Sequence, residues 1–351
     1  MPRLRRVSCS SPGLTRLRRG TGFTYVDAAG QPVTDEAALR RIDALVLPPA
    51  WEQVWICPLA DGHVQATGFD AAGRRQYRYH DDWRTARDLV KHERVLDFAE
   101  VLPVVRQQVA VDLRRRDLDR ARVLSTAVRL LDLGFFRIGS EQYASTRAGK
   151  AASFGLATLR KDHVIVTRRG VVTFDFIAKS GKHRVQSLVE PEVGAVVTAL
   201  KRRRGGGPEL LAYRVGARWV DVRSTDINDH LRALSGGEFT AKDFRTWNAT
   251  VLAAVGLAVS QDATDSSTAR KRAVTRVVQE VSHYLGNTPA VCRSSYIDPR
   301  IIDLYDSGIT IAQDLRLLGQ DATYGQPATQ GAVESAVLRL LRSPAQVQLA
   351  G

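Results

Sequence analysis

The chain has 351 residues, of which 44% are hydrophobic, and its 51 Lys and Arg against 37 Asp and Glu give a formal net charge of +14. This length favours two domains over one, and the basic balance favours a polyanionic partner, above all nucleic acid. No apolar run is long enough to cross a bilayer, and residues 1–20 lack the apolar centre of a secretory signal. We therefore expect a cytoplasmic, nucleoid-associated protein with no membrane partner.

The first 85 residues divide into two parts. Residues 1–20 hold many arginines among Ser, Pro and Gly, which predicts a flexible basic arm. Residues 21–85 are predicted to form a small β-rich N-terminal domain, because short strand patterns alternate there with Gly and Pro and a single helical pattern interrupts them. The strand patterns cover 23–26, 54–57, 63–67 and 75–79, and the helical pattern covers 35–45.

The last of these strands mixes aromatic and polar side chains. Because side chains alternate along a strand, Arg75, Tyr77 and Tyr79 share one face, and Gln76 lies on the other. Tyrosines interleaved with arginine can contact the phosphates and sugars of a duplex. The alternative is that these tyrosines are half-buried core residues of the strand.

Residues 86–320 are predicted to form a mainly helical domain, followed by a C-terminal tail at 321–351. Apolar residues recur at helical intervals in 85–99, 104–116, 120–131, 191–202, 225–234, 240–259, 268–285 and 332–341. Strand patterns at 164–167, 171–177 and 183–188 predict a three-stranded β element with Lys179 at its second turn. The expected fold class is α+β: a small β-rich domain followed by this helical domain.

Turn and cap signals surround Tyr296. Gly286 ends one helical pattern, Thr288 and Pro289 are typical of the start of another, and Asp298 with Pro299 repeats that signal. Tyr296 is thus expected on or just after a short helix, where its hydroxyl can reach a substrate. The alternative is a packed tyrosine.

Cofactor signals are missing from the sequence. Cys9, Cys57 and Cys292 are far apart, fit no metal-binding spacing and are interpreted as reduced thiols. The histidines show no ligand spacing, and no glycine-rich phosphate loop precedes a helix. We therefore expect no metal, no nucleotide and no other cofactor.

Several strings together resemble the type IB DNA topoisomerases, in particular their small poxviral and bacterial branch, over about residues 20–310. In the N-terminal part they are PPAWEQVWICP and GHVQATG. In the catalytic part they follow the family's order: FFRIGSE, FIAKSGK, KDFRTWNAT, LGNTP and RSSYIDP. Each string alone means little, whereas the ordered set is specific.

The resemblance implies a role for each matched residue. Tyr296 would attack a DNA phosphodiester and become joined to the 3′ phosphate. Arg137 and Arg245 would hold the non-bridging oxygens, and Lys179 would protonate the departing 5′ oxygen. Asn287 stands where poxviral and eukaryotic members have histidine, and an amide can donate a hydrogen bond but cannot carry a proton or a charge.

The resemblance also implies DNA contacts and an overall reaction. Gln76, Tyr77 and Tyr79 match a family string that contacts duplex DNA. The expected enzyme is a monomer that nicks one strand, lets the free end rotate and religates it, so that supercoils are relaxed without ATP or metal. The alternatives are a tyrosine recombinase, whose N-terminal domain is usually helical, and a non-catalytic DNA-binding clamp.

Each proposed site residue also has a purely structural interpretation. Arg137 can pair with Glu141 at helical spacing, and Arg245 can pair with Asp243. Lys179 can be a solvated turn residue. Asn287 can serve only as a helix cap after Gly286.

Overall fold

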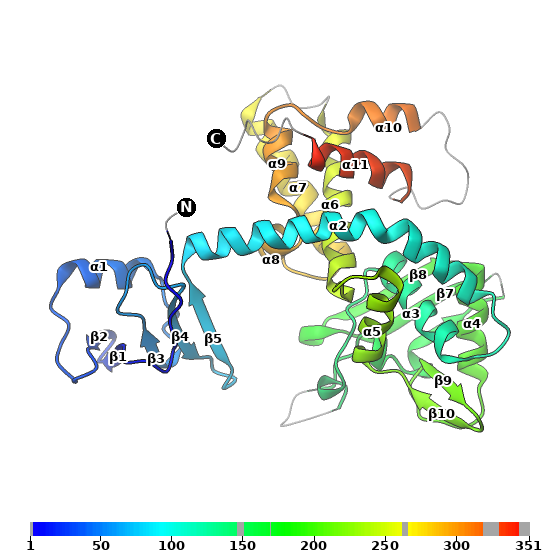
Figure 1. Ribbon diagram of the computed structural model, residues 1–351, viewed down its shortest axis with the longest axis horizontal. Helices are drawn as coiled ribbons and strands as arrows, with labels where there is room; N and C mark the ends of the chain where they lie inside the picture. Colours follow the sequence, from blue (N-terminus) through cyan, green and yellow to red (C-terminus); the bar gives the residue numbers. More distant parts are fainter. Residues whose placement is uncertain (1–2, 146–150, 169, 262–265, 319–329, 344–351) are drawn as a thin grey trace. The chain divides into compact units, whose positions relative to one another are not determined.

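The chain forms two compact units, Met1–His92 and Glu93–Gly351, in a computed structural model that describes residues 3–145, 151–168, 170–261, 266–318 and 330–343 (Figure 1). Helix α2 (Asp81–Leu113) runs through the division between the units. Most of the predicted C-terminal tail, 321–351, lies outside the described residues. Among the residues described, every helix is too short or too polar to span a bilayer.

The N-terminal unit is an antiparallel sheet with one helix, as the sequence predicted. The strand order is β2-β1-β3-β4-β5. Ile42 from α1 packs with Val54, Ile56 and Ala66 of the sheet to form a small core. The elements are β1 (Leu14–Arg19), β2 (Gly22–Val26), α1 (Glu36–Ala44), β3 (Glu52–Ile56), β4 (Val64–Phe69) and β5 (Arg75–Tyr79).

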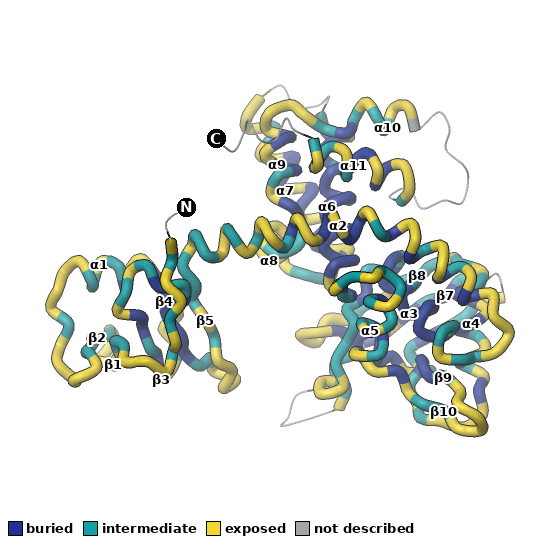
Figure 2. The backbone as a smooth tube through the Cα atoms, viewed as in Figure 1, coloured by how far each residue is buried: buried dark blue, intermediate teal, exposed yellow. Residues whose placement is uncertain are grey.

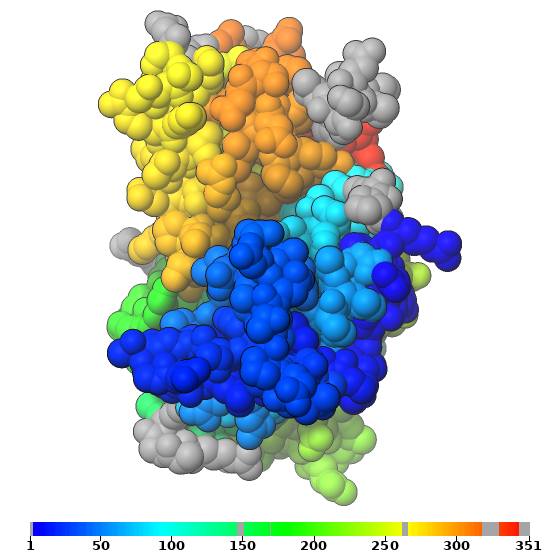
Figure 3. Space-filling model, turned by 90° about the vertical axis from the view of Figure 1, so that its left-hand side faces the viewer, coloured from blue at the N-terminus to red at the C-terminus, as the bar shows by residue number. Residues whose placement is uncertain are grey.

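Strand β1 corrects the prediction of a flexible arm over residues 1–20. It pairs with both β2 and β3, and it forms part of the dark blue surface in Figure 3. The buried Arg16 donates hydrogen bonds to the carbonyls of Pro48 and Trp51 and lies 4.2 Å from the centre of the Phe23 ring. These contacts compensate the buried charge, so a strand forms although arginines dominate its sequence.

The second unit is mainly helical, and its three-stranded sheet confirms the predicted β element. That sheet has the antiparallel order β6-β7-β8, and Lys179–Gly181 forms the turn η4 between β7 and β8. Strands β9 (Ala212–Val215) and β10 (Arg218–Asp221) form a hairpin that was not predicted. The other strands are β6 (Val164–Val166), β7 (Val171–Ile177) and β8 (His183–Val189).

The helices agree with the predicted pattern except in α2 and in α10, which was not predicted. They are α3 (Arg120–Gly134), α4 (Pro191–Arg202), α5 (Ser224–Ser235), α6 (Ala241–Val259), α7 (Ser267–Leu285), α8 (Pro289–Ser295), α9 (Pro299–Asp306), α10 (Ala312–Leu318) and α11 (Ala332–Arg342). Residues 85–99 and 104–116 were expected as two helices, but α2 is continuous through Pro103. Proline removes one backbone hydrogen bond, and the buried Leu102 and Val105 on either side keep the helix on its core.

Helix α6 is the centre of the catalytic unit. Figure 2 shows it, with α3, among the most deeply buried elements. It contacts α3, α5, α7, α9, α10 and α11. Phe244 and Trp247 are each 1% exposed on it, so the helix that carries Arg245 is held on several sides.

One buried polar cluster joins the helices α2, α3, α6 and α11. Arg106 of α2 lies 2.8 Å from a carboxylate oxygen of Asp132 in α3 and 2.5 Å from one of Glu334 in α11. Glu334 also accepts a hydrogen bond of 2.8 Å from the indole nitrogen of Trp247 in α6. Removing one partner from such a cluster leaves buried polar groups uncompensated.

We predict that Glu334→Ala lowers the free energy of unfolding by about 3 kcal/mol, because Arg106 and Trp247 would lose a buried partner. Glu192→Ala is the matched control, since Glu192 pairs with Arg114 on the exposed surface, and it should change that free energy by less than about 0.5 kcal/mol. Urea denaturation followed by circular dichroism measures both. Equal losses would contradict the role assigned to the buried cluster.

Candidate active site

Tyr296 lies directly after the short helix α8, as the turn signals predicted. Gly286 ends α7 in the left-handed conformation, with φ of 63°. Thr288 then caps α8 by accepting a hydrogen bond from the backbone of Val291. Asp298 caps α9 two residues after Tyr296. The half-buried Tyr296 ring is therefore fixed between two helix boundaries.

Arg245 of α6 lies against the Tyr296 ring. Its side chain donates hydrogen bonds to the carbonyls of Phe135 and Leu285, and its guanidinium carbon is 5.2 Å from the ring centre. Arg245 is only 4% exposed. Its buried Nε has no hydrogen-bond partner among the described residues.

Arg137 and Asn287 meet beside this pair. Arg137 donates to the backbone carbonyl of Gly286, at 3.3 Å, and to the side-chain oxygen of Asn287. The backbone of Asn287 donates to Ser282 at the end of α7, so the predicted capping role is correct for the main chain. Its side-chain nitrogen is buried and has no partner among the described residues.

An open pocket of about 710 Å³ adjoins these residues. Arg137 and Asn287 line it, together with Arg184 and Gln186 from β8. On this strand Arg184 and Gln186 lie on the less exposed face, while Val185 on the other face is 58% exposed. The pocket is thus lined by hydrogen-bond donors from guanidinium and amide groups, which suits an anion.

The clustered positive charge acts on Tyr296. Burial by itself would raise the pKa of this phenol, but the charge and polar contact of Arg245, with the charges of Arg137 and Lys242, lower the pKa below its ordinary 10.0. Burial, followed by repulsion from Arg137, lowers the pKa of Arg245 to about 10. The guanidinium therefore remains charged at neutral pH, and the phenol is biased towards its nucleophilic form.

Lys179 lies at the hairpin tip that the sequence predicted. It is exposed in η4, where Ser180 has a φ of 66°. Within the described ranges, Lys179 makes no hydrogen bond or ion pair. Tyr296, Arg245, Arg137 and Asn287 are thus brought together by the fold, whereas Lys179 remains on a solvated turn.

Two of the structural alternatives are excluded. Glu141 accepts hydrogen bonds from the backbone and hydroxyl of Ser224, and Asp243 pairs with Arg94 at 2.6 Å. Neither carboxylate binds the arginine with which the sequence could have paired it.

Strand β5 presents the expected face in the N-terminal unit. The Tyr77 and Tyr79 rings stack with their centres 5.9 Å apart, and the Arg75 guanidinium lies 5.6 Å from the Tyr77 ring. Tyr77 is 45% exposed. Gln76 lies on the other face and donates to Asp70 at 2.9 Å, so its side-chain nitrogen already has a partner.

Arg184 and Thr250 belong to the surroundings of the site and were not found from the sequence. Arg184 donates to the carbonyl of Tyr284 at 2.8 Å and to Gln186. A usable signal was the alternation along β8, where valines occupy the positions opposite to the polar ones. No comparable signal marked Thr250, because a threonine inside a helix is common.

Among the described residues, no group of three or more His, Cys, Asp or Glu side chains could hold a metal ion. The pocket lining includes the guanidinium groups of Arg137 and Arg184 and the amides of Gln186 and Asn287, and also Lys182, His183 and His283.

Comparisons with known proteins identify the family of the chain. Residues 80–314 match the family described as eukaryotic DNA topoisomerase I, catalytic core, and residues 22–70 match the bacterial DNA topoisomerase IB N-terminal domain. The chain is 27% identical over 304 residues to DNA topoisomerase 1B of Acanthamoeba polyphaga mimivirus, which covers 84% of this chain and 88% of the viral protein. DNA topoisomerase 1 of Daucus carota is 28% identical over 38% of this chain and 15% of its own length.

The chain therefore belongs to the type IB DNA topoisomerases, in their small poxviral and bacterial branch. It is an isomerase that acts on the topology of DNA, and DNA is its substrate.

We predict that Arg245→Ala raises the pKa of Tyr296, because the substitution removes the main group that favours the phenolate and leaves burial, which favours the neutral phenol. Nuclear magnetic resonance of ¹³C-labelled tyrosine measures this pKa, and Tyr296→Phe assigns the signal. Arg218→Ala, on the exposed β10, is the control and should leave the pKa unchanged. An unchanged or lower pKa in Arg245→Ala would contradict the electrostatic assignment.

Proposed function

We propose that this enzyme relaxes supercoiled duplex DNA through a covalent intermediate between Tyr296 and the 3′ phosphate of one strand. The supporting observation is the convergence of Arg245 and Arg137 on Tyr296, which joins a nucleophile to two fixed cations. The phenol oxygen attacks phosphorus and the 5′ oxygen leaves. The free end then rotates, and its 5′ hydroxyl attacks the phosphotyrosine bond to restore the strand and release Tyr296.

The arginines act on the phosphate in this proposal. Negative charge builds on the non-bridging oxygens as the pentavalent phosphorane forms, and a guanidinium offers paired donors with a permanent charge. The Nε of Arg245 and the amide nitrogen of Asn287 are donors that have no partner among the described residues. Buried donors are normally paired, so a bound phosphate oxygen would complete them.

Asn287 has a more limited role than a histidine at this position. It donates one hydrogen bond to a non-bridging oxygen and its own oxygen orients Arg137. The neutral amide stabilises the transition state without supplying a charge.

Lys179 is proposed as the general acid that protonates the 5′ oxygen. Its exposed position on a hairpin tip, with no partner among the described residues, suits a side chain that enters a DNA groove when substrate binds. Catalytic hydrogen bonds are often absent before substrate arrives.

Both units take part in binding the duplex in our proposal. Residues 21–85 contact DNA through Gln76, Tyr77 and Tyr79, residues 86–320 carry out the chemistry, and 321–351 follow as a tail. The protein acts as a monomer and needs no metal. It needs no nucleotide either, because the phosphotyrosine bond conserves the energy for religation. Because the substrate is DNA, the proposed location of the protein is the cytoplasm, in association with the nucleoid.

We expect Tyr296→Phe to abolish relaxation of a supercoiled plasmid in EDTA while it leaves duplex binding nearly intact, because only the attacking oxygen is removed. Tyr213→Phe, on the β9 hairpin away from the proposed site residues, is a matched control that keeps the nucleophile. Gel electrophoresis reports relaxation, and denaturant traps the covalent adduct. An adduct formed by Tyr296→Phe would refute the assignment of the nucleophile, and relaxation that requires paired recombination sites would favour a tyrosine recombinase.

We expect Lys179→Ala to slow cleavage on the order of 10²- to 10⁴-fold, because an alkoxide leaves poorly without a proton donor. A substrate with sulfur at the 5′ bridging position should restore cleavage by this variant, since a thiolate needs little protonation. The same substrate should rescue Arg245→Ala much less, because the non-bridging oxygens still lack a cation. Equal rescue of both variants would remove Lys179 from the general-acid role.

A further inference from the structure

The hydroxyl of Thr250 joins the helix of Arg245 to the segment that carries Tyr296. Thr250 is 1% exposed, and its oxygen accepts a hydrogen bond of 3.1 Å from the backbone of Asp298. It donates to the carbonyl of Thr246 at 3.0 Å and lies 3.4 Å from the carbonyl of Tyr296. Since Arg245 precedes Thr246 on α6, one hydroxyl fixes the backbone of both catalytic side chains.

The carboxylate of Asp298 continues this connection. It is 2% exposed and receives hydrogen bonds from two guanidinium nitrogens of Arg300, one of them at 2.7 Å. Arg300 also contacts Glu93 of α2 at 2.5 Å. The Arg300 side chain is 22% exposed, and its pairing with a nearly buried carboxylate has a defined geometry, so it transmits position better than a fully exposed ion pair.

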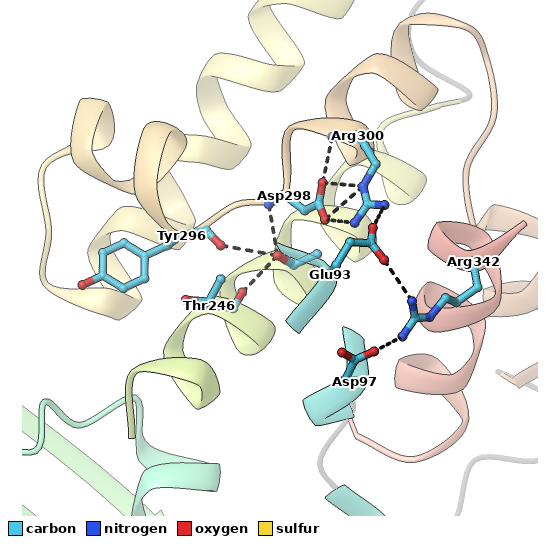
Figure 4. Close-up of polar contacts among 8 residues, drawn as sticks. Glu93, Asp97, Thr246, Tyr296, Asp298, Arg300 and Arg342 are labelled. Carbon is cyan, nitrogen blue, oxygen red and sulfur yellow. Dashed lines mark hydrogen bonds and ion pairs between the residues drawn. The ribbon is translucent and has the colours of Figure 1, made fainter. Parts of the chain in front are cut away.

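The C-terminal helix holds the far end of the connection. Arg342, the last residue of α11, contacts Glu93 at 2.9 Å, Asp97 at 2.5 Å and Glu100 at 3.1 Å. These carboxylates recur every three or four residues and therefore share one face of α2. Figure 4 shows Arg342 between Glu93 and Asp97.

We propose that α11 positions the nucleophile, through a chain of contacts that runs from Arg342 through Glu93, Arg300 and Asp298 to Thr250 beside Tyr296. This inference rests on the proposed function of Tyr296. Helix α11 lies beyond residues 80–314, over which the catalytic core of the family matches. It thereby adds a positioning element to the matched core.

The physical argument concerns distance. Attack on phosphorus requires the phenol oxygen in line with the leaving oxygen, and a displacement of about 1 Å can reduce a rate on the order of 10²-fold. The Tyr296 ring is held by its contact with Arg245 and by the backbone around Asp298. Weakening the backbone anchor changes the position of the ring while every group of the chemical step remains present.

Thr250→Val and Thr250→Ser test the near end of the chain. Valine has the shape of threonine but leaves the Asp298 N–H without its acceptor, so cleavage should slow about 10-fold. Serine keeps the hydroxyl and should restore most of the rate. Single-turnover formation of the denaturant-trapped adduct on plasmid DNA, with enzyme in excess, gives the rate, and filter binding checks that the affinity for DNA is unchanged.

Arg342→Gln and Arg339→Gln test the far end. Both residues lie on α11, but Arg339 pairs with Asp314 of α10, away from α2. Arg342→Gln should slow cleavage about 3- to 5-fold, and Arg339→Gln should not. In the Glu93→Gln background, Arg342→Gln should reduce the cleavage rate by a smaller factor. The effects of two substitutions in one chain of contacts are not additive.

The pH dependence of cleavage separates positioning from general loss of stability. Arg245, Arg137 and Lys242 are the charged groups that act on Tyr296, so a displaced ring should shift the apparent pKa of cleavage upward in Thr250→Val and Arg342→Gln. Circular dichroism at the assay temperature verifies that each variant is folded. A wild-type rate and pH profile in Arg342→Gln would overturn the role of α11, even if Thr250→Val is slow.

Different experimental results would contradict the positioning role of α11 and the proposed role of Tyr296. If Tyr296→Phe forms no adduct and the variants of Thr250 and Arg342 behave as wild type, the function stands and the positioning role falls. If Tyr296→Phe still forms the adduct, the nucleophile is wrongly assigned and the positioning role falls with it.

Discussion

The buried guanidinium of Arg245 is the constraint on which the geometry of the site depends. A charge at 4% exposure is costly unless nearby groups compensate it. The carbonyls of Phe135 and Leu285 supply that compensation, and each of them lies at the end of a helix. Satisfying Arg245 therefore fixes the ends of α3 and α7, and these ends carry Arg137 and Asn287 into the pocket.

Phe135 shows how local backbone strain serves this arrangement. It ends α3 in the left-handed conformation, with φ of 52°, which is uncommon for an aromatic residue. Its carbonyl accepts from Arg245, and the chain turns so that Arg137 follows two residues later. The strained turn thus places Arg137 in the pocket while its carbonyl binds Arg245, and that hydrogen bond stabilises the turn in return.

The free protein holds its cations in a state suited to an anionic substrate. Arg137 is bound to Asn287 and Gly286, while the amide nitrogen of Asn287 and Nε of Arg245 have no partners among the described residues. Positive charges that repel each other also lower the pKa of Arg245 and favour the phenolate of Tyr296. A phosphate would relieve that repulsion and accept hydrogen bonds from these donors. The same positive charges therefore stabilise the bound substrate and act in catalysis.

The sequence by itself determined the elements that depend on local signals. Cap and turn residues placed Tyr296 after a short helix, alternation identified the three-stranded sheet, and the ordered strings indicated the family. Local signals failed to predict elements whose formation depends on contacts with residues distant in the sequence. Strand β1 forms because Arg16 is compensated by carbonyls some thirty residues away, and α2 continues through Pro103 because its core holds both sides. The contacts of Thr250 with Asp298, and of Arg342 with Glu93, join residues far apart in the chain, and only the packing of α2, α6, α9 and α11 decides which of many possible pairs will form.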